Sequence, residues 1–261
     1  MKIEVILTPP ELPALARRDW RGATCVVFDI LRATSTFIVA LHNGADAVIP
    51  VAEMAGALEI RKAQPGVLLG GERDGVKITA AQSGGPAFDL GNSPREYTPQ
   101  CVKTKTIVSS TTNGTRAFRA CAAAPAVLAA SFLNLDATAR HIQDHPVENL
   151  LLICAGTRQE PALEDILAAG ALCELLSMNS AVELPSDAAQ IAMHSYAQVK
   201  TRLLTAICNS SNARRLLAIP ELADDVPFCL QRDTHPVVAA LDPAGRLRAI
   251  PRLPRPPFQK F

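Results

Sequence analysis

Short runs of apolar and β-branched residues alternate along the chain with longer Ala- and Leu-rich segments. Apolar runs that end in polar or glycine-containing turns are typical of strands, and the segments that follow them have helical length. This alternation predicts an α/β fold with a largely parallel sheet. The expected strands are residues 24–28, 47–51, 67–69, 106–109 and 150–154, and the expected helices are residues 34–43, 54–64, 115–122, 135–143 and 163–178.

The regular alternation weakens from about Asn179 onward. One long helix is expected over residues 187–208, and a loop-rich stretch with several prolines follows it. We therefore interpret residues 1–178 as the main α/β region and residues 179–250 as a smaller carboxy-terminal lobe packed on it. The Pro- and Arg-rich tail, residues 251–261, has a P-x-x-P spacing that fits polyproline II; a loosely held terminus is favoured over a ligand for a peptide-binding domain.

The composition narrows the function classes. With a net charge of +1, 4% aromatic residues and no basic block among them, the chain shows no surface typical of nucleic-acid binding. Its seven cysteines include no C-x-x-C pair, which argues against a disulfide framework or a zinc ribbon. The apolar run at the amino terminus is too short for a signal sequence, and no run approaches the ~18 apolar residues of a membrane span. We expect a cytoplasmic protein without nucleic-acid or membrane partners.

Polar loops follow four of the predicted strands, and ligands of open α/β sheets bind beyond the carboxyl ends of their strands. In the first loop, residues 29–36, Asp29 is a hard-oxygen ligand suited to Mg²⁺. Arg32 and the hydroxyls of Thr34 and Ser35 lead into a helix amino terminus and suit an anion. In the alternative interpretation, Thr34 or Ser35 caps the helix and Asp29 accepts a structural hydrogen bond.

The second loop, residues 70–75, offers Glu72 as a further metal ligand, although a simple hairpin turn is the alternative. The third loop, residues 109–116, precedes an Ala-rich helix and combines hydroxyls, a glycine and an arginine. Such a loop suits a phosphate oxyanion because free backbone N–H groups favour negative charge there, whereas a plain polar turn explains it as well. Its candidate substrate-binding residues are Thr111, Thr112, Asn113, Gly114, Thr115 and Arg116.

The fourth loop, residues 154–158, contributes Gly156 and Arg158, and Glu164 and Asp165 follow at the start of a helix. Small residues at a strand end let a substrate approach the backbone. An acidic pair at a helix start also has a structural explanation, because it is favourable to the helix dipole. Four such loops together are much less expected by chance than any one of them.

Three other patterns are weaker. Cys208 and Arg214 have the C-x5-R spacing of cysteine-dependent phosphatases, but no glycine lies between them and no strand precedes them. His141 and His145 lack the glutamate of H-E-x-x-H, so an exposed helix end is favoured over a metal site. Leu31 stands where haloacid dehalogenase-type phosphatases have a second aspartate, which argues against a phosphorylated Asp29 of that type.

The ordered set of motifs resembles the 2-phosphosulfolactate phosphatase family. The motifs are residues 29–36, 71–72, 91–94 (Gly-Asn-Ser-Pro), 110–115, 154–156, 164–165 and 169–170. The resemblance implies a three-layer α/β/α architecture with a largely parallel or mixed sheet. It also implies Mg²⁺-dependent hydrolysis of (2R)-2-phospho-3-sulfolactate to 3-sulfolactate and phosphate, a step on a route to coenzyme M. Arg95 and residues 159–161 depart from the family pattern and could reshape the pocket mouth.

The resemblance also suggests roles. Asp29, Glu72 and Asp165 are the expected metal ligands, and Asp29, Arg32 and Asp165 the expected catalytic residues. Arg32 and the loop from Thr111 to Thr115 are expected to hold the phosphoryl group, with Arg116 and Arg158 on the sulfonate or carboxylate. Asn92, Ser93, Thr34, Ser35 and Gly156 complete the expected substrate site.

Several alternatives stay open at this point. The chain could be a phosphatase of the same fold that acts on another small phosphorylated acid, or a binder of anionic metabolites without catalysis. The carboxylates disfavour the binder, because an anion gains nothing from them unless a metal lies between. Direct attack by water, an enzyme nucleophile and a homodimer are also left open.

Overall fold

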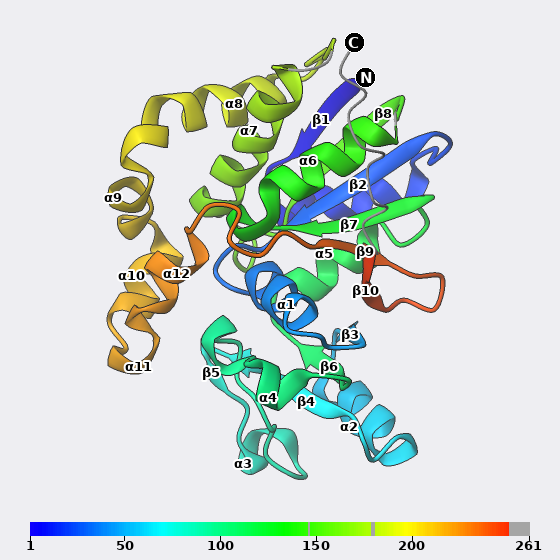
Figure 1. The fold of residues 1–261 in the computed structure, drawn as a ribbon, viewed down its shortest axis with the longest axis vertical. Helices are drawn as coiled ribbons and strands as arrows, with labels where there is room; N and C mark the ends of the chain where they lie inside the picture. The colour runs from blue at the N-terminus through cyan, green and yellow to red at the C-terminus, as the bar shows by residue number, and fades with distance from the viewer. Residues whose placement is uncertain (146, 179–180, 251–261) are drawn as a thin grey trace, which may run out of the picture.

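The computed structural model describes residues 1–145, 147–178 and 181–250, and these form a ten-stranded mixed sheet with helices around it (Figure 1). The predicted α/β class with a largely parallel or mixed sheet is confirmed. In spatial order the strands are β1 (Lys2–Ile6), β8 (Asn149–Cys154), β2 (Ala23–Phe28), β7 (Ala126–Ala130), β9 (Val238–Leu241), β10 (Leu247–Ile250), β3 (Ala47–Val51), β6 (Thr106–Ser110), β4 (Leu68–Arg73) and β5 (Val76–Lys77).

The sheet consists of two groups of parallel strands joined by an antiparallel hairpin. Strands β1, β8, β2 and β7 pair in parallel in the first group, and β3, β6 and β4 in the second. The hairpin β9–β10 pairs with β7 on one side and with β3 on the other. The stretch with several prolines after residue 208 was not predicted to contain strands. The two strands found there have four residues each and gain their stability from the strands they pair with, so the local sequence pattern does not indicate them.

Most predicted helices occur close to the expected bounds: α1 (Ala33–His42), α2 (Met54–Ala63), α5 (Gly114–Ala120), α6 (Leu135–Asp144) and α7 (Leu163–Ser177). The single long helix predicted over residues 187–208 is wrong. The structure has α8 (Asp187–Val199), a 3₁₀ turn (Lys200–Arg202) and α9 (Leu203–Cys208) instead. The break falls at Val199 and Thr201, whose β-branched side chains have low helix propensity.

Helices cover both faces of the sheet, as a three-layer arrangement requires. Alternate residues of β2 face opposite sides, with Val26 and Phe28 in one core cluster and Cys25 and Val27 in the other. The first cluster includes residues of α6, α7 and α8, and the second includes residues of α1 and α5. A smaller cluster lies between α2 and the second strand group.

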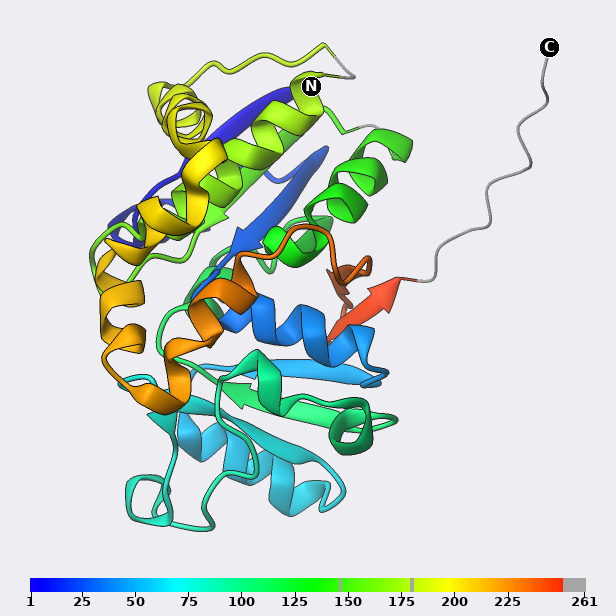
Figure 2. The ribbon, with the colours of Figure 1, turned by 60° about the vertical axis from the view of Figure 1, so that its left-hand side comes forward.

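The last helices run along one side of the molecule, from the first strand group toward the second (Figures 1 and 2). They are α9, α10 (Ser211–Leu217), α11 (Pro220–Ala223) and α12 (Asp225–Cys229). In the described part of the chain, no helix has both the length and the apolar character needed to cross a membrane. The predicted polyproline tail, 251–261, lies outside the described residues.

Candidate active site

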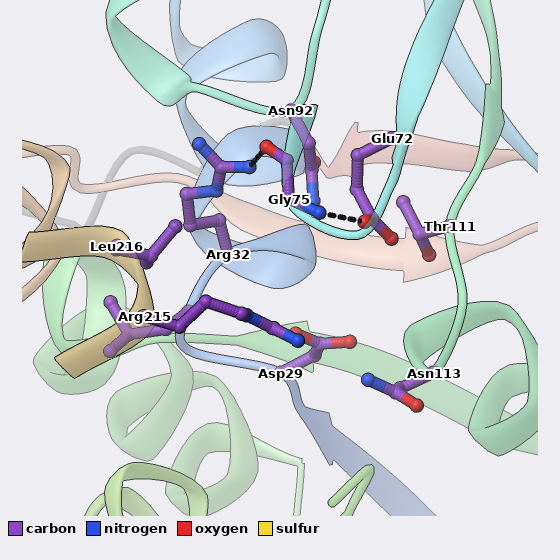
Figure 3. A pocket seen from close by; sticks show the side chains of 10 residues that line it. Asp29, Arg32, Glu72, Gly75, Asn92, Thr111, Asn113, Arg215 and Leu216 are labelled. Atoms are coloured by element: carbon purple, nitrogen blue, oxygen red, sulfur yellow. Dashed lines mark hydrogen bonds between the residues drawn. The ribbon is translucent and has the colours of Figure 1, made fainter. Parts of the chain in front are cut away.

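A pocket lies where the polar loops after β2, β4 and β6 meet α10 (Figure 3). Both strand groups and the carboxy-terminal helices therefore contribute to one site, as expected of ligand sites at strand ends. Six of the predicted site residues line the pocket: Asp29, Arg32, Glu72, Asn92, Thr111 and Asn113. Four further lining residues were not predicted to belong to the site: Leu31, Gly75, Arg215 and Leu216.

Asp29 is a buried carboxylate directly after β2. Its Oδ1 accepts a hydrogen bond from the Ala33 backbone N–H at 3.2 Å. Burial raises the pKa of Asp29 to about 7, and the negative charges of Glu72 and Glu164 add to this effect. Gly114 allows the loop to approach, since a Cβ at this position would lie 2.8 Å from Asp29 Oδ2. The site thus holds a carboxylate that has no ion-pair partner among the described residues.

Glu72 connects two of the loops through its carboxylate. Its Oε1 accepts hydrogen bonds from the backbone N–H and the hydroxyl of Thr112, at 3.1 and 2.9 Å. Its Oε2 accepts one from the Gly75 N–H at 2.8 Å. The second loop is therefore a hairpin turn, which was the alternative interpretation of residues 70–75. It also places Glu72 in the pocket.

Arg32 forms a buried ion pair with Asp225 of α12. Nη1 donates to Asp225 Oδ2 at 2.7 Å, and the two side chains are only 2% and 0% exposed. Nη2 donates to the Gly75 carbonyl. The guanidinium thus reaches the pocket in a conformation that Asp225 and the hairpin hold in place.

Asp225 also accepts hydrogen bonds from Ser93 Oγ at 2.6 Å and Arg95 Nε at 2.8 Å. Ser93, a predicted substrate-binding residue, is consequently engaged within the protein. Arg95, one of the departures from the family pattern, points to α11 and α12 rather than into the pocket. No local sequence pattern indicated that Asp225 pairs with Arg32, because the two residues lie 193 positions apart in the chain.

Asp165 is buried but does not line the pocket. Its Oδ1 accepts from the Ile30 N–H at 2.8 Å and its Oδ2 from the Gly156 N–H at 3.0 Å. Burial and the neighbouring charge of Asp29 raise its pKa well above the usual range. Both oxygens thus join the ends of β2 and β8. No group of three or more His, Cys, Asp or Glu side chains suited to one metal ion occurs within residues 1–145, 147–178 and 181–250, and a metal role for Asp165 stays a prediction.

The hydroxyls of the first loop are also used internally. Thr34 Oγ1 accepts from the Asp29 N–H at 3.0 Å, and Ser35 Oγ donates to the Ile30 carbonyl at 2.8 Å. Both residues are fully buried, which favours the interpretation that their hydroxyls stabilise the loop and the helix start instead of binding an anion. In the third loop, the Thr111 and Thr115 hydroxyls lie 3.5 Å apart, and of the two only Thr111 lines the pocket.

The structure separates the remaining predicted arginines from the pocket. Arg116 is exposed on α5, and the Arg158 side chain is 73% exposed and lies 3.7 Å from Asp74. The Arg158 backbone N–H donates to Asn113 Oδ1 at 3.0 Å. Arg215 of α10 lines the pocket instead. Sequence reasoning missed it because α10 lies where the strand–helix alternation has ended.

The weak patterns do not join the site. Cys208 and Arg214 do not line the pocket, and Arg214 Nη1 donates to the Asn209 carbonyl at 2.6 Å. The rings of His141 and His145 lie 4.4 Å apart at the end of α6, where His145 is exposed.

Buried carboxylates and Arg32 at the strand ends of an α/β sheet, with Arg215 of α10 beside them, are typical of enzymes that act on small anionic substrates. Comparison of the chain with known proteins identifies its family. The family model described as 2-phosphosulpholactate phosphatase matches residues 8–243. The chain therefore belongs to the 2-phosphosulfolactate phosphatase family, whose members are named as phosphatases, that is, hydrolases of phosphoric monoesters.

Three relatives illustrate the similarity, and each is named "Probable 2-phosphosulfolactate phosphatase". The protein of Thermotoga maritima is 40% identical over 84% of this chain and 88% of its own length. That of Caldanaerobacter subterraneus is 38% identical over 86% and 90%. That of Carboxydothermus hydrogenoformans is 34% identical over 95% and 94%.

Proposed function

We propose that this chain hydrolyses (2R)-2-phospho-3-sulfolactate to 3-sulfolactate and phosphate with the help of Mg²⁺. One observation carries the proposal: Asp29, Glu72 and Arg32 line the same pocket in a chain that belongs to this phosphatase family. We further propose that the reaction takes place in the cytoplasm, as a step on a route to coenzyme M.

The donor atoms in the pocket fit a magnesium ion. Asp29 and Glu72 offer carboxylate oxygens, and Asn92 Oδ1 is buried without a hydrogen-bond partner among the described residues. A buried acceptor without a donor is costly, and a hard cation would satisfy it. Burial, with the smaller effect of the negative charges of Glu72 and Glu164, raises the pKa of Asp29, and a cation beside this carboxyl group would favour its charged form. When bound, Mg²⁺ supplies charge neutralisation for the phosphoryl oxygens.

The other pocket residues supply donors for the phosphoryl group. Arg32 is held by Asp225 before any substrate arrives, so its charge needs no reorganisation during the reaction. The Thr111 hydroxyl and the Asn113 side chain line the same wall of the pocket. These groups favour the transition state more than the ground state, because negative charge builds on the phosphoryl oxygens as the ester bond breaks.

A phosphate-release assay tests the proposal. Purified protein is incubated with phosphosulfolactate, 2-phospholactate and other small phosphorylated acids, with Mg²⁺ and with excess chelator. We expect release from phosphosulfolactate that requires the metal and returns when Mg²⁺ is restored. Undiminished release in excess chelator would remove the metal from the proposal, and preference for a different phosphorylated acid would replace the substrate.

A further inference from the structure

We infer that Arg215 is the residue that recognises the second anionic group of the substrate, the sulfonate or the carboxylate, and that Asn212 and Glu164 position it. The inference rests on the proposed function. It replaces Arg116 and Arg158 in that role, because neither of them lines the pocket.

Arg215 reaches into the pocket from α10. Figure 3 shows its side chain extending toward Asp29, on the other side of the pocket from Asn92. Its Nη2 donates to Asn212 Oδ1 at 3.1 Å. Its Nε is buried and has no hydrogen-bond partner within the described ranges. The guanidinium therefore keeps donors for a ligand.

Asn212 is held in one orientation by two acceptors. Its Nδ2 donates to Glu164 Oε1 at 2.7 Å and to Thr157 Oγ1 at 2.6 Å. Both amide hydrogens are thus occupied, and Oδ1 faces Arg215. Glu164 is 1% exposed, so the hydrogen bonds that lead from Glu164 of α7 through Asn212 to Arg215 of α10 are shielded from water.

Charge pairing distinguishes the two pocket arginines. Arg32 has a buried carboxylate partner in Asp225, whereas Arg215 forms no ion pair with any residue that the structure describes. A partly buried cation is costly unless an anion compensates it. A bound ligand that carries an anion besides its phosphate would supply this compensation. Leu31 and Leu216 line the pocket as well and suit the short carbon chain between the two anions.

Four esters and three variants test the inference. The esters are phosphosulfolactate, 2-phospholactate without the sulfonate, 1-sulfopropan-2-yl phosphate without the carboxylate, and isopropyl phosphate without either. The variants are Arg215→Gln, Arg215→Lys and the control Arg214→Gln, whose side chain is exposed outside the pocket. Thermal melting of each variant checks that it is folded.

We expect Arg215→Gln to lower kcat/KM for phosphosulfolactate roughly ten- to a hundredfold, mainly through KM, because charge-assisted hydrogen bonds are lost. Arg215→Lys should restore part of the loss and Arg214→Gln should change nothing. The loss of kcat/KM caused by Arg215→Gln should vanish for the ester that lacks the recognised anion. The ester for which it vanishes therefore identifies that anion as the sulfonate or the carboxylate. Asn212→Ala should raise KM for the same esters while kcat changes less.

The possible negative results distinguish failure of this inference from failure of the proposed function. Unchanged kinetics of Arg215→Gln on phosphosulfolactate, or an equal loss on isopropyl phosphate, would overturn the inference and leave the proposed function intact. Absence of hydrolysis of all four esters by the wild-type protein would overturn the proposed function itself.

Discussion

Replacing Asp225 with asparagine should destabilise the protein strongly, although Asp225 is far from every predicted motif in the sequence. The carboxylate is fully buried and accepts from Arg32, Ser93 and Arg95 at 2.6 to 2.8 Å. Asparagine has nearly the same shape but removes the charge that compensates the buried Arg32 guanidinium. Breaking a buried ion pair on one side typically costs about 3–5 kcal/mol.

This cost converts into a measurable shift of the melting temperature. For a chain of this size, 1 kcal/mol corresponds to roughly 2–4 °C, so Asp225→Asn should melt about 6–20 °C below the wild type. The kcat should fall too, because Arg32 loses the group that orients it. Thermal unfolding followed by circular dichroism, together with phosphate release at low temperature, measures both effects.

The neighbouring residue provides a matched control. Asp224 is 78% exposed and lies 3.4 Å from Arg95 Nη1, so Asp224→Asn removes the same charge at the surface. Exposed ion pairs contribute about 0–1 kcal/mol, and we expect a shift of no more than ~4 °C. If Asp225→Asn melts within that same range, the buried ion pair does not stabilise this fold as we argue.

Three further predictions address the metal, Cys208 and pH. Asp29→Asn should lose at least ~10²-fold in phosphate-release rate with an unchanged circular dichroism spectrum, since it removes a proposed metal ligand without changing shape; near-normal turnover would place the metal elsewhere. Cys208→Ser should retain full activity, because a thiolate nucleophile could not be replaced by serine and Cys208 lies outside the pocket; loss of activity in a folded variant would contradict the mechanism. Burial and the nearby His42 lower the pKa of His235, so neutral His235 stabilises the fold above pH ~6.5, and this contribution is lost as pH falls through the lowered pKa. Melting temperatures between pH 7.5 and 5 should decline less for His235→Gln than for the wild type, and parallel curves would refute the assignment.

The strand ends show what can be predicted from local pattern. The apolar runs of β2 and β8 indicated buried strands because parallel strands covered on both faces are continuously apolar. Asp29, Glu72 and Thr111 were then expected to meet, since ligands bind beyond such strand ends, and the structure places all three in one pocket. The resemblance to the family specified the reaction that this geometry serves.

The partners of these residues depended on the tertiary structure. Asp225 and Arg215 come from the short helices α12 and α10, and β9–β10 is a hairpin of two short strands inserted between two strand groups. Such contacts join residues that lie far apart in the chain and leave no periodic signal around either one. The sequence by itself therefore determined the five predicted strands, the main helices and the polar loops, because local periodicity and turn chemistry encode them. Only the folded chain decided that Arg32 is held by Asp225 and that Arg215 faces the pocket, because burial and ion pairing arise only when distant segments pack together.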